Sequence, residues 1–242
     1  MSEEIQEAQK SQKSQEQKVN TKKVYMPDGI GYVELLEVFG DDLTVVNAAR
    51  VSFDKVSESL TEADQKLIRY LAKHEHVSPF FHPQVRMRIK MPIFVAREHF
   101  RHQIGLSRNE VSRRYVQTIP ECWVPAVEDL REKDKNVKQG SKATAIAEAE
   151  EVHRVVEEHI QSTVGLYEAL LAKGVAPEVA RCILPQSMYT EFMETGSLAA
   201  MARICHLRLG ADAQKEIRSY AAAISRLMAE AFPVSWAALQ GA

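Results

Sequence analysis

The stretch that decides the fold is VRMRIKMPIFVAREHFRHQIGLSRNEVSRRY, residues 85–115. Its first seven residues alternate apolar and cationic side chains, which predicts a half-buried β-strand. Pro92 follows and suits the first turn of a helix, which we expect to end at Gly105. The polar residues 107–114 then suit a loop that can offer backbone N–H groups to an anion. The stretch therefore predicts a strand, a helix and a loop, in that order.

The second half of this stretch, residues 97–115, is unusually rich in cations. It carries five arginines and two histidines among two serines, an asparagine and two glutamates. So many like charges repel one another unless anions neutralise them, and an arginine fork binds a phosphate or carboxylate through two parallel hydrogen bonds. Arg97 and Arg101 lie four residues apart and share a helix face, while Glu98 and His102 share the adjacent face. A solvated basic helix face is the alternative, but the interleaved polar residues favour an anion-binding site.

The rest of the chain predicts helices around a small sheet. Strand patterns cover 31–39 and 188–195, and helical patterns cover 41–52, the stretch after Thr61, 143–172, 177–184, 197–209 and 212–232. The expected fold class is α/β in the broad sense and α+β in detail: a single domain with one long helix, packed around a small mixed or antiparallel sheet. Residues 1–22 are almost all polar and predict a disordered tail, which leaves residues 23–242 as the folded domain.

Composition limits the class of function. The 242 residues are 45% hydrophobic and 26% charged, with a net charge of −2, which is ordinary for a globular protein and argues against nucleic acid as a partner. The three cysteines are widely spaced and odd in number, so we expect neither a metal site nor disulfides. Free thiols in turn favour a reducing compartment. No apolar run is long enough for a membrane span and no signal core precedes the domain. We therefore expect a cytoplasmic protein without a membrane partner.

Several isolated residues outside the cluster have two interpretations. Arg181 and Arg208 each lie in the last turn of a predicted helix, where a cation can complement the helix dipole or bind a ligand. His74 and His76 lack a third ligand at metal-binding spacing, so we favour a capping role over a metal site. The cysteines are expected to be buried, inert thiols rather than nucleophiles. These are Cys122, Cys182 and Cys205.

At this point several sequence blocks resemble one family. Arg101-His102 followed by Ser107-x-Asn109-Glu110-x-Ser112-x-Arg114-Tyr115 is similar to the signature of the flavin-dependent thymidylate synthases. The resemblance extends over about residues 24–235. Further matching blocks occur in the same order at 48–53, 76–80, 92–97, 179–185 and 207–216.

The resemblance implies an activity, a set of cofactors and an assembly. Members of this family bind FAD, take a hydride from NADPH and transfer the methylene of 5,10-methylenetetrahydrofolate to dUMP, which gives dTMP and tetrahydrofolate. They are homotetramers of α/β subunits, and one active site draws residues from neighbouring subunits. The expected partners of this chain are therefore these small molecules and further copies of itself.

The resemblance also assigns residues. It implies that Arg208 is the catalytic residue, because a cation beside the uracil ring favours the N3-deprotonated, electron-rich base that attacks the methylene. The segment Ser112–Arg114 would grip the phosphate. The residues implied to bind dUMP are Glu98, Arg101, Glu110, Ser112, Arg113, Arg114, Arg181 and Arg208. Those expected to bind FAD are Ser52, His76, Ser78, Arg101, His102, Asn109 and Glu110, which match positions of the family, together with Gln103 and Arg203, which do not.

The chain departs from the family signature at one turn. Gln103 stands where an arginine is usual, and four residues, rather than three, separate His102 from Ser107. We expect Arg203 to compensate for the charge lost at Gln103, and Arg108 is another candidate. Glu98, Phe81, Arg203 and Asp212 also replace the residues that are common at their positions. A family member that has lost catalysis and senses flavin or nucleotide, and a small nucleic-acid-binding module, are the competing functions.

Overall fold

The structure, a computed structural model, describes residues 22–135 and 140–241. Its centre is a five-stranded antiparallel sheet in the order β1-β2-β3-β7-β4. These strands are β1 (Lys22–Tyr25), β2 (Tyr32–Phe39), β3 (Gln84–Pro92), β7 (Tyr189–Ser197) and β4 (Leu106–Glu110). A separate hairpin pairs β5 (Arg131–Lys133) with β6 (Ser141–Ala145). The α+β fold class is therefore confirmed, and the sheet is antiparallel rather than mixed.

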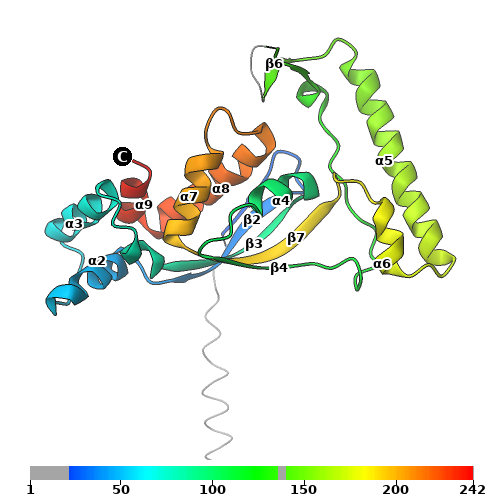
Figure 1. Cartoon of the computed structure of the whole chain (residues 1–242). Helices are drawn as coiled ribbons and strands as arrows, with labels where there is room; N and C mark the ends of the chain where they lie inside the picture. The colour runs from blue at the N-terminus through cyan, green and yellow to red at the C-terminus, as the bar shows by residue number, and fades with distance from the viewer. Residues whose placement is uncertain (1–21, 136–139, 242) are drawn as a thin grey trace, which may run out of the picture.

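Helices cover one face of the sheet and both of its ends (Figure 1). α7 (Leu198–Arg208), α8 (Lys215–Ala231) and α4 (Ile93–His99) lie over one face, whereas α2 (Asp42–Arg50), α3 (Glu62–Lys73) and α9 (Pro233–Leu239) gather at one end. The long α5 (Ala149–Ala172) stands at the other end, beside α6 (Pro177–Ala180). Short 3₁₀ helices are η1 (Val51–Phe53), η2 (Ser78–Phe81), η3 (Val127–Asp129) and η4 (Arg181–Ile183). No helix of the described ranges is long and apolar enough to cross a membrane.

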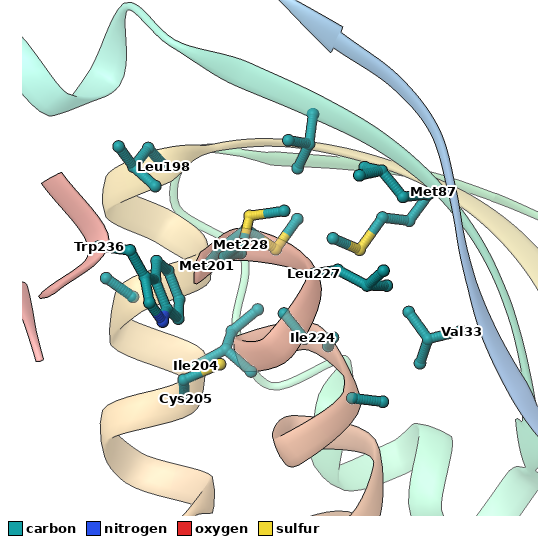
Figure 2. Packing of buried hydrophobic residues seen from close by; sticks show 14 of the residues in the cluster. Val33, Met87, Leu198, Met201, Ile204, Cys205, Ile224, Leu227, Met228 and Trp236 are labelled. Carbon is teal, nitrogen blue, oxygen red and sulfur yellow. The ribbon is translucent and has the colours of Figure 1, made fainter. Parts of the chain in front are cut away.

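The core lies between the inner sheet face and the helices α7, α8 and α9 (Figure 2). Buried side chains from the strands meet those of the three helices; they include Val33, Met87, Met201, Ile204, Ile224, Leu227, Met228 and Trp236. Full burial of such an aliphatic side chain stabilises the fold by roughly 1.5 to 3 kcal/mol. Because α7 contributes several of them, the helix that carries Arg208 in its last turn is packed firmly into the core.

The predicted strand at the start of the quoted stretch is confirmed as β3. Val85, Met87 and Ile89 are buried, while Arg86 and Arg88 project from the opposite face. On that outer face the cations meet carboxylates of the flanking strands, at Glu37 and Glu191. The alternation in the sequence thus reports one apolar face and one ion-paired face, as a half-buried strand requires.

The predicted capping of α3 is also confirmed. The Thr61 side chain accepts a hydrogen bond from the Asp64 backbone N–H, and the Asp64 carboxylate accepts one from the Thr61 N–H. Asp64 is buried and also pairs with Arg50 of α2 at 2.5 Å. The bonds from Thr61, with a further contribution from Arg50, hold the pKa of Asp64 below its usual value. One capping residue therefore both starts α3 and joins it to α2.

Three predicted boundaries are wrong, two of them within the arginine cluster and one at the start of the long helix. The helix that follows β3 ends at His99 rather than at Gly105. Residues 107–110, predicted as part of a loop, belong to β4, because their backbone pairs with β7, a strand about 85 residues further along the chain. The long helix begins at Ala149 rather than at 143, since residues 141–145 pair with β5.

Two further expectations concern the ends of the chain. The polar tail predicted for residues 1–22 lies outside the described residues, except for Lys22, which begins β1. Near the other end, the sequence predicted that the last helix stops at Phe232, but Pro233 opens one more helix, α9. Proline suits a first helical turn as well as a stop, which explains the missed helix.

Candidate active site

Arg208 is fixed at the end of α7 by contacts with α4 and the residues that follow it. Its Nε donates to Nε2 of His102 at 3.2 Å. Its terminal nitrogens donate to Glu98, one to the carboxylate at 3.4 Å and one to the backbone oxygen at 3.2 Å. The side chain keeps 21% exposure. A guanidinium held in this way can act on a ligand as well as complement the helix dipole.

His102 is held as a neutral ring with a defined tautomer. An arginine can only donate hydrogen bonds, so Nε2 of His102 carries the lone pair and Nδ1 carries the proton. Burial, and next the positive charge of Arg208, lower the pKa of His102 to about 4. The ring therefore stays neutral at physiological pH and offers Nδ1–H as a donor.

The turn formed by residues 103–106, where the chain departs from the family signature, is held through its carbonyl groups. Arg203 donates to the backbone oxygen of Ile104 at 2.6 Å, and the backbone N–H of Ser197 donates to the backbone oxygen of Gly105 at 3.0 Å. Gly105 has a φ of +76°, and a Cβ there would lie 2.9 Å from the Ser197 hydroxyl. The longer turn is thus a defined structure that leaves Gln103 exposed.

Some residues expected to bind FAD lie around this turn. Phe81 of η2 packs against Gly105, so the segment that carries Ser78 adjoins the turn that carries Gln103. Arg203 reaches the same turn from α7. Asn109 lies in β4 and is exposed.

Two other expected FAD residues belong to segments that follow α2 and α3, the helices at one end of the sheet. Ser52 lies on the exposed η1, which follows α2. His76 is also exposed, and its ring centre lies 6.0 Å from that of Tyr70. His74 is the C-cap of α3, as the capping interpretation requires. Within the described residues, no group of three or more acidic, histidine or cysteine side chains could hold a metal ion.

A second group of expected residues lines a cavity of about 500 Å³ between β4, β7 and the segment that follows β4. Glu110, Ser112, Arg113 and Arg181 lie in its wall. Glu110 accepts a hydrogen bond from the Thr190 hydroxyl at 2.5 Å, and Arg113 donates to the backbone oxygen of Thr118 at 2.5 Å. The cavity thus combines a hydroxyl and two guanidiniums, the groups that a phosphate requires.

The remaining residues expected to bind dUMP lie outside this cavity wall. Arg114 pairs with Glu178 at 3.4 Å and is exposed, as is Arg101. Glu98 and Arg208 contact each other but do not line the cavity. Within one chain, the structure therefore separates the expected dUMP residues into a cavity group and an Arg208 group.

The cavity also contains residues that sequence reasoning missed. Lys90 of β3 lines it and pairs with Glu121. Tyr189 lines it too, and its hydroxyl donates to Asp28 at 2.7 Å. Burial, followed by this hydrogen bond, raises the pKa of Tyr189. The alternating cations of β3 were a signal for Lys90, whereas nothing in the local sequence singled out Tyr189.

The cysteines differ more from one another than expected. Cys205 is buried, donates to the Ala221 oxygen at 3.4 Å, and has a pKa that burial raises to about 12. Cys122 is half-buried and its pKa is also raised by burial. The expectation of a buried thiol is wrong for Cys182, which is exposed because η4 lies at the surface. The two thiols with raised pKa values are poor nucleophiles.

A cavity of this size lined by arginines is suited to an anionic small molecule, and a fixed arginine beside a neutral histidine is suited to act on a charged group of that molecule. Comparison with known proteins narrows this class. Residues 34–234 match the family model described as thymidylate synthase complementing protein. The chain belongs to the family of flavin-dependent thymidylate synthases.

Individual relatives agree with this assignment. A flavin-dependent thymidylate synthase of Thermus thermophilus is 41% identical over 210 residues, which cover 87% of this chain and 76% of the relative. The flavin-dependent thymidylate synthase of Kosmotoga olearia is 41% identical over 212 residues, which cover 86% of this chain and 89% of the relative. This chain is also similar to the crystal structure of a UMP/dUMP methylase, PolB of Streptomyces cacaoi, bound with 5-Br dUMP. The TM-score is 0.74 and the sequence identity 30%, and the match covers 85% of this chain and 93% of PolB.

Proposed function

We propose that this chain catalyses the reductive methylation of dUMP to dTMP, with 5,10-methylenetetrahydrofolate as the carbon donor, FAD as cofactor and NADPH as reductant. Family membership over most of the chain supports the activity. The observation that carries the proposal is Arg208, the expected catalytic residue, because Glu98 and His102 hold its guanidinium in one orientation. A fixed cation at the end of a rigid helix is suited to stabilise charge that develops on a bound base.

Arg208 acts on the uracil ring by electrostatics. A guanidinium beside the ring lowers the pKa of N3–H and stabilises the electron-rich anion whose C5 attacks the methylene carbon. Glu98 and His102 hold the arginine so that little reorganisation is needed during the reaction. His102 is neutral, so it adds no competing positive charge at this point.

The cavity group binds the phosphate of dUMP. Ser112 supplies a hydroxyl, and Arg113 and Arg181, which also line the cavity, supply charge-assisted hydrogen bonds. Each such bond contributes about 1.5 to 3 kcal/mol. Arg101, Glu110 and Arg114 complete the expected set around the nucleotide.

FAD is held by residues of the 103–106 turn together with residues of η1, η2 and the segment after α3. Two hydroxyls, two imidazoles, two amides, a carboxylate and two guanidiniums match the ring edges and diphosphate of a flavin nucleotide. They are Ser52, His76, Ser78, Arg101, His102, Gln103, Asn109, Glu110 and Arg203. When bound, FAD supplies the hydride chemistry. The residues of this chain orient the cofactor, and Arg203 brings a cation beside the uncharged Gln103.

The active chain is a homotetramer with shared active sites. Two observations support this: the Arg208 group and the cavity group are separate within one chain, and the long α5 stands away from the sheet with Val155 and Leu166 exposed. If one site takes Arg208 and Arg181 from different chains, mixing Arg208→Ala chains with Arg181→Ala chains restores part of the activity, because some sites then contain both arginines. No recovery after subunit exchange would show that each chain supplies both residues to its own site.

Two measurements test the activity. The purified protein should be yellow, with the flavin band near ~450 nm, and should release tritium from C5-labelled dUMP only when NADPH and methylenetetrahydrofolate are both present. A yellow protein that binds dUMP without releasing tritium would instead be a flavin or nucleotide sensor.

A further inference from the structure

The arginine cluster contains one member that points into the protein. Arg108 of β4 lies directly opposite Glu194 of β7, and both side chains project toward the helix-covered face of the sheet. Glu194 is fully buried, and Arg108 keeps only 14% exposure. The Nε of Arg108 donates to the Glu194 carboxylate. A buried carboxylate is costly unless it is paired, so this contact fixes the arginine firmly.

His99 of α4 completes the buried cluster. Its Nε2 lies 3.0 Å from each oxygen of the Glu194 carboxylate. Burial alone would raise the pKa of Glu194, but His99 and Arg108 outweigh it and hold that pKa below its usual value. The guanidinium of Arg108 also stacks over the Phe100 ring at 5.1 Å. Glu194 is therefore an ionised anchor that joins β7, β4 and α4.

The second contact of Arg108 leads to the candidate active site. Its terminal nitrogen donates to the backbone oxygen of His102 at 2.5 Å. The ring of the same His102 accepts the hydrogen bond from Arg208. A continuous path of hydrogen bonds thus runs from buried Glu194 through Arg108 and His102 to Arg208. Arg108 also holds the residue just before the turn whose carbonyls bond Arg203 and Ser197.

We propose that Arg108 and Glu194 form a positioning pair for the reaction proposed above, on which this inference rests. Glu194 orients Arg108, and Arg108 fixes the His102 backbone, so that the His102 ring faces Arg208 despite the longer turn. Arg108 acts through His102 and binds neither the phosphate of dUMP nor the diphosphate of FAD. Two of its three guanidinium nitrogens are engaged by the Glu194 carboxylate and the His102 oxygen, and the third, Nη2, is buried.

Kinetics of Arg108→Met and Glu194→Gln test this role. Both variants should lose about tenfold or more in kcat, while the KM for dUMP changes less than about twofold. The double variant should be no worse than the more impaired single variant, because both changes break the same path. A larger rise in the KM for dUMP in Arg108→Met, an unchanged kcat in Glu194→Gln, or losses that multiply in the double variant would each overturn the proposal.

Controls separate this role from general destabilisation and from failure of the proposed function. Arg86→Met breaks an exposed arginine–glutamate pair on β3 and should leave kcat unchanged. Histidine ¹⁵N NMR should show the Nδ1–H tautomer of His102 in the wild type and a mixture of tautomers in Glu194→Gln. Glu194→Gln is the milder of the two substitutions, so this measurement remains available if Arg108→Met does not fold. An unaltered His102 signal would contradict the positioning role. This readout does not need turnover, so an inactive wild type would refute the proposed function while the pair could still be tested.

Discussion

Replacing His102 with glutamine should change how stability depends on pH. In the folded protein, burial and the charge of Arg208 lower the pKa of His102 to about 4, whereas an unfolded chain binds this proton near pH ~6.5. Below that pH the unfolded state carries more protons, so acid favours unfolding. The ring therefore contributes stability above the unfolded pKa and loses it as pH falls toward 4. Glutamine cannot titrate, and its side-chain oxygen can still accept from Arg208.

The size of the effect follows from the two pKa values. Between about pH 7.5 and about pH 5, the wild type should lose about 2 kcal/mol relative to His102→Gln. The residue is only 8% exposed, so solvent screens this difference little.

Urea unfolding, followed by tryptophan fluorescence at one fixed protein concentration, measures the effect. His159→Gln, which removes an exposed histidine on α5, is the matched control. Because it keeps His102, its stability should fall with pH by the same amount as that of the wild type. A difference between the wild type and His102→Gln that is constant over this range would refute the assignment of His102 as a buried neutral ring.

Three further predictions concern the ligands and the chemistry. Arg203→Ala should weaken FAD binding about tenfold, because it removes the cation beside Gln103; unchanged affinity in a flavin titration rules out the compensation. Arg181→Ala should raise the KM for dUMP by about ten- to a hundredfold through loss of a charge-assisted bond, and an unchanged KM would place the phosphate elsewhere. Replacing all three cysteines should leave turnover intact, and its loss in a folded tetramer would indicate a cysteine mechanism; they are Cys122, Cys182 and Cys205.

The parts of the fold that were predictable depend on short-range signals. β3 follows from its alternation, and α3 from the Thr61–Asp64 capping box, because both patterns lie within a few residues. β4 was missed because polar residues become a strand only when β7 supplies the hydrogen-bonding partner. Intrinsic propensity is weaker than such long-range pairing.

The candidate site shows the same limit. The sequence motifs identify Arg208 and His102, but their contact joins residues 106 positions apart, and only the folded chain brings them together. Arg108 resembles its neighbours in the cluster, since a charge pattern does not say which way a side chain points. Its inward direction follows from Glu194, a residue that the sequence did not single out.

The most direct test of the account is tritium release from C5-labelled dUMP by Arg208→Ala, compared with the wild type and with Arg208→Lys at saturating FAD, NADPH and methylenetetrahydrofolate. Removing one fixed electrostatic donor typically costs about 10²- to 10³-fold in kcat, and we expect a loss of that size in Arg208→Ala. Lysine should recover only part of it, because it cannot reproduce the bonds to His102 and Glu98. Equal rates of release from Arg208→Ala and the wild type would contradict the claim that Arg208 is the catalytic residue.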